Sequence, residues 1–115
     1  MVDVTAERFE ELVADALDAI PPELGRYMDN VAVFVDDRPP GGLYGLYQGV
    51  PLTHREGYGG GGMVMPDRIT IFRQTICRDA RSEADVVAQV RKTVVHEVAH
   101  HFGISDQRLT ELGYG

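Results

Sequence analysis

The chain has little cysteine, no excess of basic residues and no long apolar run, and each scarcity excludes a class of protein. Cys77 is the single cysteine among 115 residues, so no disulfide can form within the chain and a cytoplasmic location is expected. Eleven Lys and Arg residues stand against 18 Asp and Glu residues, which gives a formal net charge of −7. Proteins that bind nucleic acid usually carry a basic stripe, so the acidic balance argues against a nucleic-acid partner. The same balance is compatible with binding a cation.

Membrane and secreted classes are excluded by similar reasoning. No apolar stretch approaches the roughly 20 residues that a bilayer-spanning helix needs, so no membrane partner is expected. Residues 1–7 contain neither a basic nor an apolar segment, so no secretory signal is expected. Because domains typically contain about 100–150 residues, residues 1–115 are expected to form one domain. Cys77 is expected to be a small buried apolar group rather than a catalytic thiol.

The first part of the chain predicts a helix with one buried stripe. Its apolar residues recur at helical spacing; they are Phe9, Leu12, Val13, Ala16, Leu17 and Ile20. Thr5 is the expected N-cap, and the prolines at 21 and 22 are expected to end the helix. Residues 22–30 are expected to hold one more helical turn.

Short β-branched runs bounded by turn residues predict strands. These runs span residues 31–35 and 69–76. A further short strand is considered over residues 43–47, inside the loop-rich stretch from 39 to 62. The glycine run at 59–62 predicts a flexible connector. It lacks the following helix and the Lys-Ser/Thr pair of a phosphate-binding loop.

The clearest predicted element is a long helix over residues 83–102. Ser82 and Asp85 form a capping box before its apolar run, and Gly103 stands where a left-handed residue ends a helix. Four valines fall on one side of this helix and are expected to face the core; they are Val87, Val90, Val94 and Val98. A short last helix is expected over residues 106–112, starting from Ser105 or Asp106.

Two histidines on the long helix have the spacing of metal ligands. His96 and His100 are four residues apart, so both imidazoles can face one ion from the same side of the helix. Glu97 points about a third of a turn away, where it can act as a general base on a water molecule. Gly103 lets the chain turn back, so Asp106 can supply a third ligand.

Three protein ligands leave one coordination position open for water. A metal ion there lowers the pKa of that water from about 15.7 to about 7 and polarises a carbonyl group. Glu97 would take the proton as the water attacks the carbonyl. The pattern therefore predicts metal-assisted hydrolysis.

Simpler interpretations of the same residues stay open. His96 and His100 could be polar residues on a solvated helix face, and Asp106 could simply cap the last helix. His101 falls toward the apolar side of the helix, so we expect it to have a structural or interfacial role rather than to bind metal.

The segment His96-Glu97-x-x-His100-x-x-Gly103-x-x-Asp106 resembles the motif of the zincin metallopeptidases, in the variant with aspartate as third ligand. The whole chain resembles the small bacterial zincin-like metallopeptidase family often called minimal zincins. The resemblance implies an α+β fold in which a small mixed or antiparallel sheet packs on an N-terminal helix and a long active-site helix. It also implies that His96, His100 and Asp106 bind Zn²⁺ and that Glu97 is the catalytic base.

The resemblance further implies a peptide or protein substrate. The strand that ends near Ile76 would lie along the cleft and pair with the substrate main chain. The chain departs from larger zincins because only nine residues follow Asp106, too few for a methionine turn, while Met63 and Met65 lie upstream.

Residues that could stabilise an oxyanion are present by type alone. They are Tyr47, His54, Tyr58 and Tyr114. Two functions therefore follow: a zinc-dependent peptidase, or a catalytically weak or inactive zincin scaffold that binds peptides or proteins. A zinc hydrolase that acts on RNA is disfavoured by the acidic balance and by the glutamate directly after His96. Nothing in the sequence indicates an oligomeric state.

Overall fold

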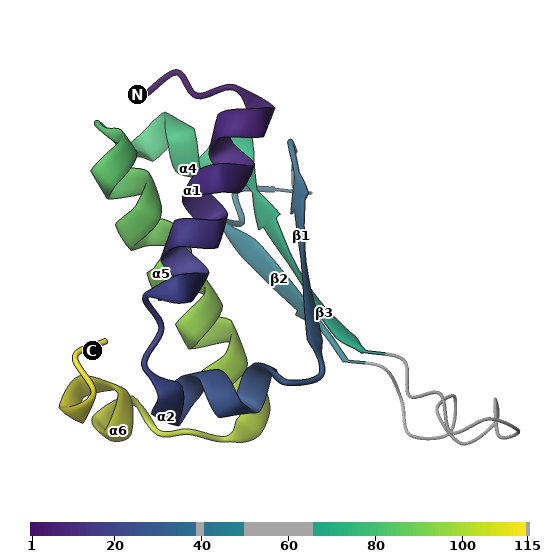
Figure 1. Ribbon diagram of the computed structural model, residues 1–115, viewed down its shortest axis with the longest axis vertical. Coiled ribbons are helices and arrows are strands. Elements are labelled where there is room, and N and C mark those ends of the chain that lie inside the picture. Colours follow the sequence, from purple (N-terminus) through teal and green to yellow (C-terminus); the bar gives the residue numbers. More distant parts are fainter. Residues whose placement is uncertain (39–40, 50–65, 115) are drawn as a thin grey trace, which may run out of the picture.

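The computed structural model describes residues 1–38, 41–49 and 66–114. Figure 1 shows helices on one side of a small sheet, which confirms the predicted α+β class. The described elements are α1 (Ala6–Asp18), α2 (Pro22–Gly25), a 3₁₀ turn η1 (Arg26–Met28), β1 (Val31–Asp36), β2 (Gly45–Gln48), β3 (Asp67–Phe72), α4 (Arg73–Asp79), α5 (Glu83–Phe102) and α6 (Asp106–Glu111). The connector predicted at 59–62 lies outside the described residues.

Helix α1 begins and buries its apolar stripe as the sequence predicts. The side chain of Thr5 caps it by accepting a hydrogen bond from the backbone N–H of Arg8 at 3.2 Å. Its fully buried residues share one face and are Phe9, Leu12, Val13 and Ala16. The helix ends before the two prolines, and α2 with η1 supplies the predicted further turn.

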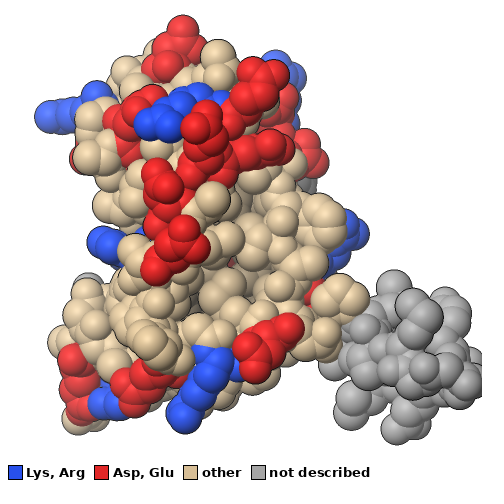
Figure 2. Space-filling model, viewed as in Figure 1, with Lys and Arg blue, Asp and Glu red and all other residues tan. Residues whose placement is uncertain are grey.

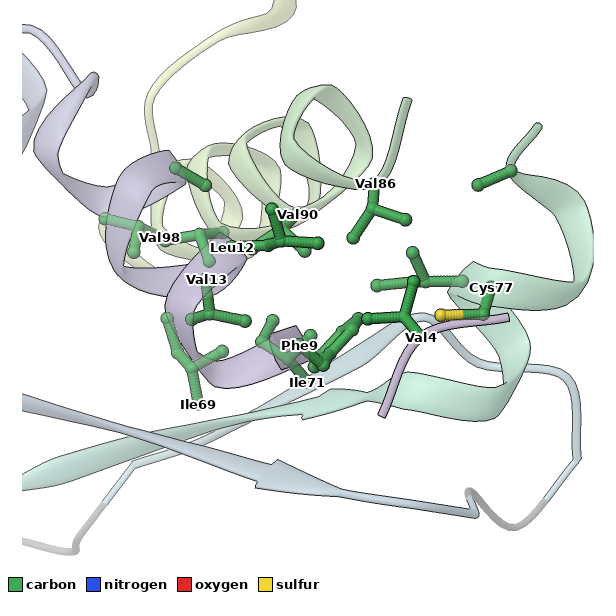
Figure 3. Close-up of a cluster of buried hydrophobic side chains, with 14 residues drawn as sticks. Val4, Phe9, Leu12, Val13, Ile69, Ile71, Cys77, Val86, Val90 and Val98 are labelled. Carbon is green, nitrogen blue, oxygen red and sulfur yellow. The ribbon is translucent and has the colours of Figure 1, made fainter. Parts of the chain in front are cut away.

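The sheet is mixed and has β3 at its centre among the described strands. The strand order is β1-β3-β2, with β1 parallel and β2 antiparallel to β3. Ile69 and Ile71 of β3 are fully buried and point toward α1 and α5 (Figure 3). One face of the sheet therefore packs against both helices, as the fold prediction requires.

The apolar face of α5 is wider than the predicted valine stripe. Val90, Val94 and Val98 are buried against α1 and the sheet, and Val87 is partly buried against the same cluster, so the stripe faces the core. Val95 and Ala99 are also buried, but in a second cluster with Leu24 of α2 and Leu109 of α6. Helix α5 is thus held from two directions, and its histidines must lie on the remaining surface.

The strand predicted over 69–76 is too long at its end. β3 stops at Phe72, and Arg73 begins α4. The guanidinium group of Arg73 donates to a carboxylate oxygen of Asp37 and to the carbonyl of Val4, both at 2.8 Å. These contacts hold the chain where it turns, and Ile76 is then buried from a helix instead of from a strand. Long-range contacts therefore override the local β pattern.

The prediction that this strand pairs with a substrate peptide is also wrong. β3 is hydrogen-bonded to β1 on one side and to β2 on the other, so both of its edges are already used. A strand can accept a further chain only at the edge of a sheet.

The cysteine prediction is confirmed. Cys77 lies on α4 with 7% of its surface exposed, and it is a free thiol packed in the main core (Figure 3). Burial raises the pKa of the thiol above its ordinary value, which disfavours the reactive thiolate. Among the described helices, none has both the length and the apolar character needed to cross a bilayer.

A close approach between β2 and α5 fixes the helix relative to the sheet. A Cβ atom built on Gly45 would lie 2.7 Å from Cγ2 of Thr93 on α5 and 3.2 Å from the backbone oxygen of Thr70 on β3. Both distances are shorter than ordinary contacts, so only glycine fits at this position without movement.

We predict that Gly45→Ala lowers the free energy of unfolding by about 1–3 kcal/mol, because the added methyl group overpacks this contact. Thr93→Ser removes the nearer of the two clashing atoms and keeps the hydroxyl that donates to the carbonyl of Gln89. Urea denaturation of the single and double variants measures the effect. The double variant should recover part of the loss, and strictly additive losses would contradict the proposed contact.

Candidate metal centre

The predicted metal ligands lie on the last turns of α5, whose ends are fixed by local interactions. Ser82 accepts a hydrogen bond from the backbone N–H of Asp85 at 3.1 Å at the start of the helix. At the other end Gly103 has φ 72° and ψ 23°, the left-handed conformation that ends helices. The backbone N–H of Ile104 then donates to the carbonyl of Ala99 at 2.8 Å, so the chain reverses directly after the histidines.

His96 and His100 are neighbours on one side of α5. Their ring centroids are 6.1 Å apart, and the rings meet edge to face at 90°. His96 is half-buried, whereas His100 is exposed. The structure thus places two imidazoles side by side on the surface of α5 that the core does not use.

Glu97 is half-buried beside His96, and Asp106 is the exposed first residue of α6. Ser105 caps α6 by accepting a hydrogen bond from the backbone N–H of Arg108 at 3.1 Å. The alternative that Asp106 serves as the cap is therefore wrong. Within the described parts of the chain, the carboxylates of Glu97 and Asp106 and the ring of His100 have no hydrogen-bond or ion-pair partner.

The histidines and Asp106 do not form a closed site in this structure. Among residues 1–38, 41–49 and 66–114, no three His, Cys, Asp or Glu side chains come close enough together to hold one ion. Instead, Nε2 of His96 lies 2.8 Å from the backbone carbonyl of Tyr114. The C-terminal turn holds that carbonyl in place, because the N–H of Tyr114 donates to the carbonyl of Leu109 at 2.8 Å.

The donor set nevertheless fits a zinc ion in its chemistry. Two imidazoles and one carboxylate are a common ligand set for zinc in hydrolases, where the fourth position stays open. The side chains of His100, Glu97 and Asp106 lack competing partners among the described residues, so they remain available. Coordination by Nε2 of His96 would require the carbonyl of Tyr114 to leave that atom.

His101 belongs to a different cluster from His96 and His100. Its ring stacks on Tyr47 of β2 with centroids 4.1 Å apart, and its Nε2 lies 3.6 Å from Oδ2 of Asp67. The hydroxyl of Tyr47 donates to the same carboxylate oxygen at 2.7 Å, and Asp67 is buried. A Cβ atom on Gly49 would lie 3.1 Å from the His101 ring, so this packing is close. The cluster supports the expected structural role of His101.

The residues considered as oxyanion donors are only partly described. The hydroxyl of Tyr47 donates a hydrogen bond to Asp67. Tyr114 lies beside His96, but through its backbone carbonyl. His54 and Tyr58 lie outside the described residues, as do Met63 and Met65.

Most of the visible acidic charge lies over α1, away from the motif. Figure 2 shows red side chains gathered on the face that this helix presents, and its exposed acids are Glu7, Glu10, Glu11, Asp15 and Asp18. Arg8 pairs with Glu11 and with Glu83 of α5 at 3.3 and 2.9 Å. Glu97 and Asp106 are only two of the 18 acidic residues, so the net charge of −7 is not a signature of the candidate metal centre.

Two contacts of the histidines of α5 carry no sequence signal that could have predicted them. The carbonyl of Tyr114 is a backbone atom, which every residue type provides. Asp67 is 34 positions before His101, and an isolated aspartate at the start of a strand is an ordinary feature.

A family model described as zincin-like metallopeptidase matches residues 28–115, a range that includes all of α5 and α6. Among solved structures, a conserved hypothetical protein from T. thermophilus is similar to this chain with a TM-score of 0.54 and 26% sequence identity. That alignment covers 86% of this chain and 94% of the other. The comparison with curated proteins finds no significant match.

We predict that His100→Ala weakens zinc binding by at least about 100-fold, whereas His101→Ala leaves the zinc affinity within about twofold. The reason is that His101 packs on Tyr47 and Asp67, so its loss should cost about 1 kcal/mol of stability instead. Zinc affinity is measured by competition with a chromophoric chelator, and stability by urea denaturation. Equal loss of zinc in the two variants would contradict this assignment.

Proposed function

We propose that this chain, which belongs to the zincin-like metallopeptidase family, is a zinc-dependent peptidase whose site is built on the last turns of α5. His96, His100 and Asp106 would hold the zinc ion, and Glu97 would be the general base. The observation that carries the proposal is the family match over residues 28–115, which covers all four of these residues. The adjacent rings of His96 and His100 support it.

In this proposal the two histidines and Asp106 hold the metal, and Glu97 transfers the proton. When bound, a zinc ion would lower the pKa of a water molecule to about 7 and polarise the scissile carbonyl. Glu97 follows His96 directly, so its side chain leaves the helix about 100° away from the histidine pair and can face the water instead of the metal. It would take the proton from the attacking water and pass it to the departing amine.

The surroundings of Glu97 suit this role. Its side chain is half-buried and has no ion-pair partner among the described residues. An ionised carboxylate accepts hydrogen bonds through both of its oxygens, and no cation in the described part of the chain is paired with this one. Glu97 is therefore free both to orient a water molecule and to accept its proton.

A second candidate function is a zincin scaffold that binds peptides or proteins without cleaving them. The contact between the Tyr114 carbonyl and Nε2 of His96 favours it, because this contact occupies an atom that a zinc ligand would need. The two functions differ in turnover. Metal-dependent cleavage in a screen of peptides and unfolded proteins would exclude the second.

We predict that Glu97→Gln retains zinc but loses at least about 100-fold in kcat for a cleaved peptide, because the amide cannot accept the proton. Zinc content by elemental analysis and single-turnover cleavage are measured on the same preparation. Glu111→Gln is the matched control, since Glu111 is exposed on α6 and paired with Arg108. Unchanged cleavage by the zinc-loaded Glu97→Gln protein would exclude Glu97 as the base.

We predict that Asp106→Asn weakens zinc binding by at least about tenfold, since the third ligand loses its negative charge. Ser105 caps α6, so the fold should tolerate the change, and the urea midpoint should stay within about 0.2 M of the parent value. Chelator competition gives the affinity. A normal zinc affinity for Asp106→Asn would mean that another group is the third ligand.

A further inference from the structure

A small pocket lies on α5 directly before the histidines. Its volume is about 220 Å³, and its walls come from α5 and the C-terminal turn. The lining residues are Ala88, Arg91, Lys92, Gly113 and Tyr114. Two of the five are cations, although the protein as a whole is acidic.

The pocket continues the row of side chains that contains the candidate metal ligands. Ala88, Lys92, His96 and His100 follow one another at intervals of four residues, so they form one inclined row on the surface of α5. Each interval corresponds to a rise of about 6 Å. Lys92 therefore stands one turn from His96 on the same side of the helix.

Tyr114 connects the pocket to His96. Its carbonyl is 2.8 Å from Nε2 of His96, while its ring centroid is 6.0 Å from the guanidinium carbon of Arg91. The same residue thus forms a wall of the pocket and contacts the first candidate ligand. Zinc binding by Nε2 of His96 would break the contact with the Tyr114 carbonyl, whereas the spacing of Lys92 and His96 is set by α5 itself. A group held by Lys92 would therefore lie one helical turn from the proposed reaction site.

The two cations of the pocket have no carboxylate partner among the described residues. Neither Arg91 nor Lys92 forms an ion pair there, whereas Arg8, Arg73 and Arg108 do. Two such charges on adjacent residues repel each other, and an anion between them would relieve the repulsion.

Two acidic residues that share a hollow with Lys92, Asp79 and Asp85, have other partners. Arg78 and Tyr44 hydrogen-bond to Asp79 and lower the pKa of its carboxyl group to about 2, so its charge is already compensated. Asp85 accepts a hydrogen bond from the backbone N–H of Arg81 at 3.0 Å.

We propose that this pocket binds a carboxylate of the substrate, and that the peptidase prefers peptides with a carboxylate close to the scissile bond. The inference rests on the proposed function, because it assigns the pocket to the substrate of that site. An extended peptide advances about 3.3 Å per residue, so a group in the pocket belongs within about two residues of the scissile bond. The carboxylate can come from an Asp or Glu side chain or from the free C-terminus of the peptide.

The test separates binding from cleavage by using zinc-loaded Glu97→Gln protein. Three fluorescent peptides are compared that differ only at one residue and at the C-terminus. One has Glu and an amidated C-terminus, one has Gln and a free C-terminus, and one has Gln and an amidated C-terminus. Fluorescence anisotropy gives each affinity at low salt and at about 0.5 M NaCl. At least one carboxylate peptide should bind about fivefold or more tightly than the neutral peptide, and salt should reduce the difference.

Charge variants then locate the preference. Lys92→Gln and Arg91→Gln should each remove most of the preference for the carboxylate, and Lys92→Arg should keep it because the charge remains. Arg81→Gln is the matched control, since this exposed arginine lies before α5 and outside the pocket. Of the two carboxylate peptides, the one that the parent protein binds more tightly than the neutral peptide identifies the source of the carboxylate, a side chain or a C-terminus.

Equal affinity for all three peptides, or a preference that Lys92→Gln leaves unchanged, would overturn the inference. Cleavage by the parent protein tests the proposed function separately. Cleavage without any preference would leave the peptidase proposal standing and exclude the carboxylate pocket. A preference that depends on Lys92, with no cleavage of any peptide, would keep the pocket and exclude the proposed reaction.

Discussion

The burial of α5 on two sides is the constraint on which the rest of the structure depends. Val90, Val94 and Val98 pack toward α1 and β3, and each fully buried valine contributes roughly 1.5–3 kcal/mol. Gly45 lets β2 approach the same helix closely at Thr93. With these contacts made, the rotation of α5 is fixed, and His96 and His100 must face away from the core.

The second cluster determines what lies near the histidines. Leu109 of α6 is fully buried against Val95 and Ala99, so α6 and the C-terminal turn are attached to the same end of α5 as the motif. An ion pair between Arg108 and Glu23 also joins α6 to α2. This attachment brings the Tyr114 carbonyl to His96 and keeps Asp106 at the same end of α5.

The sequence predicts best where structure is decided locally. Both ends of α5 follow from Ser82 and Gly103, whose roles depend on residues within one turn. The end of β3 does not, because Arg73 is held by Asp37 and Val4, which are 36 and 69 positions away. The helix period alone separates His101 from His96 and His100, but its partner Asp67 belongs to β3 and could not be predicted. For the same reason the contact of His96 with a backbone carbonyl could not be predicted, and the ligand role of Asp106 stays a prediction.

The candidate metal centre is also where the local sequence pattern and the tertiary structure differ. The relative positions of His96, Glu97 and His100 are determined by helix geometry, because α5 is helical over the whole of this segment. The third ligand depends instead on the path of the chain after Gly103, which the second cluster and the Tyr114 turn both influence. A zinc ion would add ligand bonds that favour coordination of His96 over its contact with the Tyr114 carbonyl.

The most direct test is X-ray absorption at the zinc edge on protein loaded with one equivalent of zinc. The account predicts a four-coordinate ion with two imidazole nitrogens at about 2.0–2.1 Å and carboxylate and water oxygens at about 2.0–2.2 Å. His96→Ala and Asp106→Asn should each remove one of these contributions. A site without a histidine pair, or a protein that fails to bind one equivalent of zinc, would contradict the account.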